Sequence, residues 1–470
     1  MYTEMITAYV QSHREEIVET LKSLVRIPSV EGTPAKDAPF GRECAAILRA
    51  TEALYSTKGF KTALYADSGY LLAEGGGDGD KSIGLFAHGD VVPVSDDWVL
   101  TDPFTPIEKD GFLVGRGVED NKSGIVASLF AMRALRDLGI PVKSRIVAFT
   151  GSNEESGMCD IDAYVHKHRI PDLSLVADCA FPVYRGEKGV FRFVANAKTR
   201  ATDILDATGG QAFNIVLGDV ALRLRYSDAL DLYLSSQKKD SFTVTRDGDA
   251  LVLRAFGRSR HAAMPEGSLN AMYVAASLLK DAPIADSDRT LMRSVADMLA
   301  VYDGSALGIK RDYADFGALT ATNGIVRMEN GILSLSFDTR YGAGDGKDLE
   351  IAVAERLAAY GFAYEGKEIN PGYLTPADHP AVLALIAAYR EVTGDEKGQS
   401  CLSAGGTYAR HLTNAFPTGT TLFPPIPFSL PDGHGGVHQP DECISIDSLL
   451  TGIVITANMI LACDKVNQNA

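Results

Sequence analysis

The chain has 470 residues, of which 46% are apolar and 23% are charged, and its formal net charge is −16. This length allows two or three domains with a well-buried core, and the composition is typical of a soluble globular protein. The negative charge argues against nucleic acid or an anionic membrane as a partner, because both attract positively charged surfaces.

Residues 1–30 combine charge with helical periodicity and contain no apolar core of a signal peptide, so we expect none. No stretch approaches the roughly 18 apolar residues of a transmembrane helix. The six cysteines are scattered without a C-x-x-C pair, which is typical of reduced, structural thiols. We therefore expect a cytoplasmic protein that is a monomer or a small homo-oligomer and has no membrane partner.

The first third of the chain alternates short apolar strands with amphipathic helices. Strands are predicted at residues 83–87, 145–150 and 173–177. From Ser123 to Leu138 apolar side chains recur every three or four residues, which predicts a helix with one buried face. This alternation favours an α/β fold with a mostly parallel sheet flanked by helices.

After about residue 188 the pattern changes. Residues 242–254 predict an antiparallel hairpin, residues 269–280 a helix, and residues 333–338 a half-exposed strand. From about His379 the α/β pattern returns, with a helix at 381–393 that Gly394 would close. We therefore divide the chain into a catalytic domain in two segments, 1–187 and 376–470, around an inserted α+β lid domain, 188–375.

Two common catalytic loops are excluded by their spacing. The glycine run at 75–82 has Asp80 where a phosphate-binding loop needs glycine, and the predicted strand at 83–87 follows it where that loop needs a helix. No G-x-S-x-G serine motif occurs in the chain.

Acidic and histidine side chains follow the predicted strands at the points where these strands end. They are His88, Asp90, Glu154, Glu155 and Asp178, and Asp120 stands in the loop before the predicted helix at Ser123. In open parallel sheets ligands bind beyond the carboxyl ends of the strands, so we expect these side chains along one edge. Asp90 lies two residues after His88 in an extended segment and could hold the other N–H of the imidazole.

Each of these residues alone has a simpler interpretation. The H-x-D pattern at 88–90 is more often structural, Asp120 could cap the following helix, and the glutamates could lie in a solvated loop. Together, so many carboxylates at one edge would repel each other unless cations lie between them. We predict two divalent metal ions, Zn²⁺ first and then Mn²⁺ or Co²⁺, because the ligands mix nitrogen and oxygen.

A last candidate ligand, His438, lies in the segment 435–442 near the end of the chain. His434 competes with it as a ligand, and His438 could also be an ordinary surface histidine.

Seven segments, in this order, resemble the motifs of the M20 family of metallopeptidases. They are HGD (88–90), GRGVEDNKSG (115–124), NEESG (153–157), VADCAFP (176–182), GRSRHAAMP (257–265), GGTYAR (405–410) and VHQPDE (437–442). The resemblance spans most of the chain and is strongest to the PepV-like dipeptidases of Gram-positive bacteria, which have this length and a large inserted lid. It implies a zinc-exopeptidase-like catalytic domain and the hydrolysis of dipeptides.

The resemblance also implies which residues hold the metal ions. His88 and Asp178 would hold one ion. Glu155 and His438 would hold the second, and Asp120 would bridge the two.

The same resemblance implies the catalytic residues. Asp90 would orient His88, Glu154 would be the general base, and His261 of the lid would stabilise the oxyanion. The peptide bond between Asp120 and Asn121 would be cis.

Substrate contacts follow from the resemblance as well. Arg340 and Asn214 would bind the substrate carboxylate, with help from the backbone amides around Gly405, Gly406 and Thr407. The chain departs from many relatives at two positions. Asn121 replaces an aspartate, and Ala180 replaces a glutamate near the amino end of the substrate.

Two alternatives to a dipeptidase stay open. Related enzymes of this fold cleave another amide, as N-acyl amino acid and succinyl-diaminopimelate hydrolases do. A metal-binding protein without catalysis is the second alternative.

Overall fold

The computed structural model describes residues 2–200, 202–238 and 240–469, which form two compact units. The first unit is built from the segments 1–186, 375–401 and 406–470, and the second from 187–374 and 402–405. The sequence division placed residues 402–405 in the catalytic domain, which is wrong. Lys188 donates its backbone N–H to the carbonyl of Ser403 (2.9 Å), and Arg340 donates to that of Ala404 (3.2 Å), so the second unit holds this short segment.

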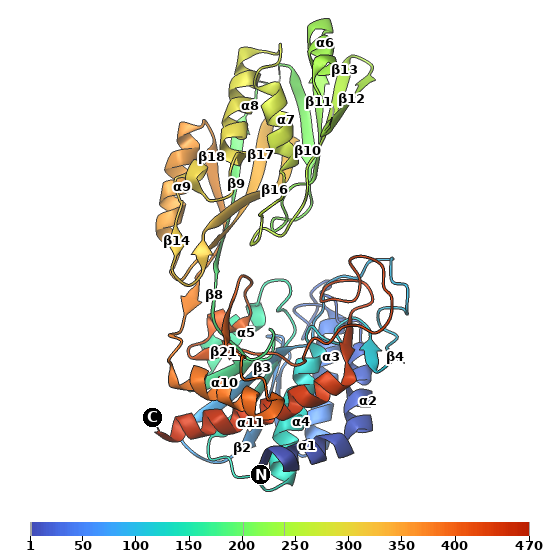
Figure 1. The fold of residues 1–470 in the computed structure, drawn as a ribbon, viewed down its shortest axis with the longest axis vertical. Helices are drawn as coiled ribbons and strands as arrows, with labels where there is room; N and C mark the ends of the chain where they lie inside the picture. Colours follow the sequence, from blue (N-terminus) through green and yellow to red (C-terminus); the bar gives the residue numbers. More distant parts are fainter. Residues whose placement is uncertain (1, 201, 239, 470) are drawn as a thin grey trace. The chain divides into compact units, whose positions relative to one another are not determined.

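A six-stranded mixed sheet forms the centre of the first unit (Figure 1). In spatial order its strands are β1 (Lys61–Tyr65), β2 (Tyr70–Gly76), β6 (Arg145–Gly151), β3 (Ser82–His88), β7 (Leu173–Val176) and β21 (Ala415–Pro417). The last four are parallel, whereas β1 and β2 pair antiparallel. The predicted mostly parallel sheet is confirmed, and the predicted strand ends differ from the observed ones by one residue.

Helices cover both faces of this sheet, so β3 is buried along its whole length. One face carries α1 (Tyr2–Ser12), α2 (Arg14–Val25), α3 (Arg42–Thr57), α4 (Lys122–Asp137), α10 (Pro380–Thr393) and α11 (Ile446–Asn469). The other face carries α5 (Cys159–Lys167) and the short helix η2 (Tyr408–His411), where Tyr164 and Tyr408 pack against Phe149. Gly394 ends α10 in the left-handed conformation with φ 70°, as predicted.

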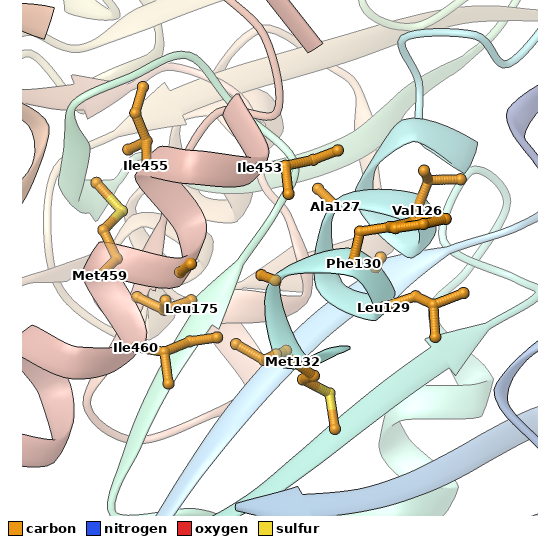
Figure 2. Packing of buried hydrophobic residues seen from close by; sticks show 14 of the residues in the cluster. Val126, Ala127, Leu129, Phe130, Met132, Leu175, Ile453, Ile455, Met459 and Ile460 are labelled. Atoms are coloured by element: carbon orange, nitrogen blue, oxygen red, sulfur yellow. The ribbon is translucent and has the colours of Figure 1, made fainter. Parts of the chain in front are cut away.

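The main core of the first unit lies between α4, α11 and the sheet. Figure 2 shows side chains of α4, among them Val126 and Phe130, in one cluster with Ile453 and Ile460 of α11 and Leu175 of β7. The helix predicted at residues 123–138 is α4, and its apolar face forms part of this core.

Helix α11 corrects one sequence expectation. It is, within the described residues, the one helix long and apolar enough to cross a membrane, with a hydropathy of 1.8 in its most apolar window, although no such stretch was expected. In this structure 78% of that window is buried, and the helix packs on α4 and α10. Packing in a protein core accounts for its composition.

A small antiparallel sheet brings two distant segments of the first unit together. It consists of β4 (Ile107–Lys109), β5 (Phe112–Val114) and β22 (Cys443–Ser445), with β5 in the middle. Cys443 pairs with Val114, so Glu442 lies beside the loop 115–121 that leads into α4.

The second unit is an α+β domain around an eight-stranded antiparallel sheet. In spatial order its strands are β12 (Phe242–Asp247), β13 (Ala250–Phe256), β11 (Asp219–Arg225), β10 (Ile204–Gly209), β16 (Thr320–Glu329), β17 (Ile332–Tyr341), β9 (Gly189–Lys198) and β18 (Ala363–Asn370). Its helices are α6 (Asp228–Ser236), α7 (Ala271–Leu279), α8 (Asp286–Leu299), the short η1 (Ser305–Leu307) and α9 (Lys347–Ala359). The predicted hairpin is β12 and β13, and the predicted helix at 269–280 is α7.

Five short strands complete the list. β14 (Asp312–Tyr313) pairs with β15 (Gly317–Ala318), and β8 (Val183–Glu187), β19 (Tyr373–Leu374) and β20 (Ser400–Ser403) lie where the chain passes between the units.

Strand β17 is more buried than its sequence predicted. Ser336 is 4% exposed and Asp338 is fully buried, although alternation predicted one solvated face. The strand lies inside the sheet, and the carboxylate of Asp338 is paired with the guanidinium groups of Arg192 and Arg340. The polar side of β17 therefore faces a buried ion cluster and not solvent.

The α4–α11 core makes a direct prediction. Ile453→Ala removes a fully buried side chain and should lower the free energy of unfolding by about 2–5 kcal/mol, because it leaves a cavity. Urea unfolding followed by the fluorescence of Trp98, the single tryptophan, reports on the first unit. As a control, Leu383→Ala on α10 alters a side chain that is 53% exposed and should change stability by less than about 0.5 kcal/mol. Equal effects of the two substitutions would contradict this packing.

Candidate active site

The structure gathers the five predicted metal ligands and the predicted general base, Glu154, at the carboxyl edge of the parallel strands of the first unit. They are His88, Asp120, Glu154, Glu155, Asp178 and His438. His88 is the last residue of β3, the glutamates follow β6, and Asp178 follows β7. Asp120 arrives from the loop before α4, and His438 from the loop before β22, so six residues from five segments meet at one place.

Asp120 is the centre of this cluster. Its Oδ1 lies 3.0 Å from Nε2 of His88, and its Oδ2 lies 2.9 Å from Nε2 of His438. Nε2 of His88 is also 3.7 Å from Oδ1 of Asp178, and Nε2 of His438 is 3.1 Å from Oε2 of Glu155. The two oxygens of Asp120 thus face two separate histidine–carboxylate pairs.

The hydrogen bonds of His88 define which nitrogen faces the cluster. Its Nδ1 lies 3.1 Å from the carbonyl oxygen of Asp90 and 3.4 Å from the Asp90 carboxylate, so Nδ1 carries the proton. Nε2 then presents its lone pair to the carboxylates of Asp120 and Asp178. A lone pair against two carboxylates is repulsive unless a cation lies between them.

Two buried atoms support a cation at this place. Nε2 of His88 and Oδ1 of Asp120 are shielded from solvent and make no hydrogen bond of acceptable geometry with the residues that the structure describes. Buried polar atoms rarely lack a partner, and imidazole nitrogen and carboxylate oxygen are the usual ligands of Zn²⁺, Mn²⁺ and Co²⁺. The donor set therefore fits divalent metal ions.

The adjacent glutamates face different parts of the cluster. Ligand atoms of Glu155 group with those of His88 and Asp120, whereas those of Glu154 group with His88 and Asp178, in each case within 4.8 Å. The backbone N–H of Glu155 donates to Oδ2 of Asp90 (3.1 Å). Asp90 therefore contacts both the His88 imidazole and the segment that carries the two glutamates.

Charges in the cluster shift one another strongly. Burial alone would lower the pKa of His438, but its contacts with Asp120 and Glu155 raise it to about 10. Burial raises the pKa of Glu155 to about 7, and the charge of Asp120 adds to this effect. Burial would raise the pKa of Asp120, but the two histidines bring it below its usual range. His438 therefore holds its proton beside an ionised Asp120, whereas Glu155 ionises less readily than a free glutamate.

Glu442 holds the loop that carries Asp120, a role that the sequence did not reveal. This fully buried carboxylate accepts hydrogen bonds from Arg116 Nη1 (2.8 Å) and from the backbone N–H groups of Gly117 (3.0 Å), Glu119 (2.9 Å) and Asp120 (3.1 Å). The VHQPDE motif includes Glu442, but only the position of β22 beside β5 shows which loop it binds.

Asp160 holds the loop before the two glutamates in a similar way. It accepts hydrogen bonds from the backbone N–H groups of Ser152 (2.7 Å) and Asn153 (2.9 Å) and from the hydroxyl of Tyr408 (2.6 Å). Two loops of the site are therefore fixed by buried carboxylates that lie outside the cluster.

His434, the competing candidate ligand, pairs with Asp441 and does not join the cluster. Its Nδ1 lies 2.7 Å from the carboxylate of Asp441, which also accepts the backbone N–H of Leu100 (2.8 Å). His438 alone enters the cluster, from a turn in which the backbone N–H of Gly435 donates to the carbonyl of Pro440 (2.8 Å). His438 has a φ of 63°, in the left-handed region that non-glycine residues seldom adopt.

The peptide bond between Asp120 and Asn121 is cis, as expected. Asp120 does not cap α4, because Asn121 occupies the N-cap position and no side chain makes a capping hydrogen bond there. The amide of Asn121 donates to the carbonyl of Ala177 and to Oδ1 of Asp178 (3.0 Å). The asparagine at position 121 thus orients the Asp178 carboxylate.

In the second unit, His261 and Asn214 lie on neighbouring backbone segments. Ala262 donates its N–H to the carbonyl of Asn214 (2.8 Å). The N–H of Ala263 donates to Nδ1 of His261 (3.2 Å), and burial lowers the pKa of this histidine, with the charge of Arg340 adding to the effect. His261 is therefore neutral and carries its proton on Nε2, where it can donate.

Arg340 is held by an acidic partner. Its Nε and Nη2 donate to the two carboxylate oxygens of Asp338 (2.6 and 3.1 Å), and the side chain is buried. Gly405 belongs to the same unit and donates its N–H to Oγ of Ser403 (3.1 Å), whereas Gly406 and Thr407 belong to the first unit.

The first unit thus carries a candidate metal-binding site at the carboxyl edge of a mixed sheet, and an α+β domain is inserted in its chain. A family model for peptidase family M20/M25/M40 matches residues 84–462, so the chain belongs to this family. The resemblance drawn from the seven motifs is confirmed.

Similar sequences come from Gram-positive bacteria. "Putative dipeptidase YtjP" of Bacillus subtilis is 28% identical over 467 residues, which cover 95% of this chain and 97% of the relative. "Putative dipeptidase SSP1012" of Staphylococcus saprophyticus is 28% identical over 475 residues, covering 95% and 96%.

Solved structures show the same fold. Human carnosine dipeptidase 1 matches with a TM-score of 0.62 at 18% identity and covers 99% of both chains. An M20 family metallo-carboxypeptidase from Sulfolobus solfataricus matches at 0.58 and 18%, covering 96% of this chain and 99% of the other. Aminoacylhistidine dipeptidase from Vibrio alginolyticus matches at 0.56 and 15%, covering 95% and 96%.

The Glu442 contacts make a prediction about stability. Glu442→Gln leaves the buried guanidinium of Arg116 without its countercharge and should lower the free energy of unfolding by about 3–5 kcal/mol. Urea unfolding monitored by Trp98 fluorescence measures this loss. Glu108→Gln, which breaks an exposed pair with Lys22, should cost at most about 1 kcal/mol. If Glu442→Gln were as stable as Glu108→Gln, Glu442 would not stabilise the loop that carries Asp120.

Proposed function

We propose that this protein is a dinuclear metal-dependent dipeptidase that cleaves the single peptide bond of dipeptides. The observation that carries the proposal is Asp120, whose two oxygens face His88 at 3.0 Å and His438 at 2.9 Å. Such an arrangement suits a carboxylate that bridges two ions. The names of the curated relatives, dipeptidases of similar length, support the substrate class.

The proposed ligands divide around Asp120. His88 and Asp178 would hold one ion, Glu155 and His438 would hold the other, and Asp120 would bind both. Zn²⁺ is the first choice for this mixed set, with Mn²⁺ or Co²⁺ as alternatives. When bound, the ions lower the pKa of water at the site towards about 7 and polarise the scissile carbonyl.

Glu154 is the proposed general base. Its ligand atoms lie beside His88 and Asp178, and burial raises its pKa well above its ordinary value, with the charge of Asp178 adding to the effect. It takes the proton of the attacking water and returns that proton to the leaving amine. Asp90 keeps the His88 imidazole in the tautomer that leaves Nε2 free to bind.

Three groups of the second unit are proposed to act on the substrate. His261 donates from Nε2 to the oxyanion that forms as the carbonyl is attacked. Arg340 and Asn214 bind the carboxylate of the substrate, supported by the backbone around Gly405, Gly406 and Thr407. Recognition of that carboxylate would limit cleavage to short peptides. We place this activity in the cytoplasm, on the scattered and free cysteines, in a monomer or small homo-oligomer.

Purified protein supplied with Zn²⁺ or Mn²⁺ should hydrolyse members of a dipeptide panel. Glu154→Ala should retain its metal and lose turnover by at least about a hundredfold, because only proton transfer is removed. Glu155→Ala should instead lower the metal content, measured by elemental analysis. No turnover above the Glu154→Ala background would refute the dipeptidase, and activity limited to N-acyl amino acids would assign the chain to the deacylases. If both variants behave alike, the assigned roles of the two glutamates are wrong.

His261→Ala should reduce kcat by about 10²–10³ while metal content and melting temperature stay unchanged, because one oxyanion donor is lost. Steady-state kinetics on the best dipeptide of the panel measure this change. His166→Ala, which removes an exposed histidine of α5, is the matched control and should leave kcat intact. A loss shared by both variants would point to a general effect on folding.

A further inference from the structure

Two small cavities lie next to the metal-binding cluster within the first unit. One of about 140 Å³ includes Asp120 and Asp178 in its lining, and the other measures about 270 Å³. Glu119, Phe423 and Val437 line both cavities. These three residues therefore form the boundary between the proposed reaction site and a pocket beside it.

The walls of this pocket are apolar and exposed. Phe423 is 63% exposed, Val437 is 40% exposed, and Ile426, which lines the larger cavity, is 37% exposed. Large apolar side chains are usually buried, and these three gather beside one site. An apolar side chain of a bound ligand would cover them.

Glu119 is the one carboxylate that lines both cavities. Its backbone N–H donates to Glu442 (2.9 Å), and its carbonyl accepts the hydroxyl of Ser123 (2.7 Å), so the backbone is fully engaged. Its carboxylate has no hydrogen bond or ion pair with the residues that the structure describes. By contrast, the nearby carboxylate of Glu442 binds a guanidinium and three backbone N–H groups.

A half-buried carboxylate without a hydrogen-bond partner offers a contact for a cationic group of a ligand. The carboxylates of Asp120 and Glu442, which act on it electrostatically, are acidic like itself. A ligand with a cationic group and an apolar side chain would satisfy both the carboxylate and the apolar wall. The amino-terminal residue of a dipeptide carries both groups on one carbon atom.

We propose that Glu119 binds the α-ammonium group of the amino-terminal residue of the substrate, whose apolar side chain packs on Phe423 and Val437. This inference rests on the proposed dipeptidase function. It assigns selection for a free amino terminus to a residue outside the metal ligands, and it predicts a preference for apolar amino-terminal residues.

The test compares Leu-Leu with 4-methylpentanoyl-leucine, which has the same shape but lacks the ammonium group. Metal-loaded wild-type protein should bind Leu-Leu at least about ten times more tightly than it binds this analogue. The comparison uses the KM for Leu-Leu and the constant with which the analogue inhibits Leu-Leu hydrolysis competitively. In Glu119→Gln the KM for Leu-Leu should rise about ten- to a hundredfold, while the inhibition constant of the analogue stays unchanged. Glu43→Gln, an exposed glutamate of α3, is the control and should alter neither value.

Other results would overturn the inference in distinguishable ways. Equal affinity of the wild type for the two compounds, or an unchanged KM in Glu119→Gln, would refute the ammonium contact while the dipeptidase function stands. Loss of metal from Glu119→Gln would make Glu119 part of the metal site. If Glu119→Gln raised the KM for Lys-Leu but not for Leu-Leu, Glu119 would bind a basic side chain of the substrate and not its α-ammonium group. If the wild type hydrolyses no dipeptide, the proposed function fails and this inference fails with it.

Discussion

The site depends on the repulsion between carboxylates that the fold forces together. Asp120 faces one histidine with each oxygen, and Asp178 and Glu155 approach the same Nε2 atoms of those histidines. Without positive charge between them, burial of these groups would cost far more than the surrounding hydrogen bonds return. The fold must therefore hold the carboxylates in place before any cation arrives. It does so with further buried carboxylates, since Glu442 and Asp160 bind the backbone of the loops that present Asp120 and the two glutamates.

The sequence predicted the strands, the helix at 123–138 and the side chains at the strand ends, because these follow from local periodicity and from the geometry of parallel sheets. It did not predict the contact between Glu442 and the loop 115–121. These segments lie more than 300 residues apart in the chain, and only the pairing of β22 with β5 brings them together. Long-range pairing of this kind leaves no periodic signal. The same limit explains why His434 and His438 could not be told apart before the partner of His434, Asp441, was known.

The burial of two elements does not follow from their sequence patterns alone. Helix α11 has the composition of a membrane span, and β17 has the alternation of a half-solvated strand, yet both are buried within their units. Periodicity reports the polarity of a face but not what covers it. In α11 the covering groups are other helices, and in β17 they are charged partners, since Asp338 is held between Arg192 and Arg340. A buried aspartate in a strand is strongly destabilising unless it has such partners. The polar alternation of β17 is therefore explained by the ion cluster.

The proposed metal ligands all belong to the first unit, whereas the proposed catalytic and substrate-binding groups are divided between the two units. All six residues of the metal cluster belong to the first unit, as do the carboxylates that anchor their loops. His261, Asn214 and Arg340 belong to the second unit, where local contacts alone set the tautomer of the histidine and the orientation of the guanidinium. The contacts described for these groups lie within the unit that carries them. Under the proposed roles, a substitution that disturbs metal affinity should map to the first unit, whereas one that alters only turnover or substrate binding can map to either. Glu119 is the proposed case of a first-unit residue that acts on the substrate alone.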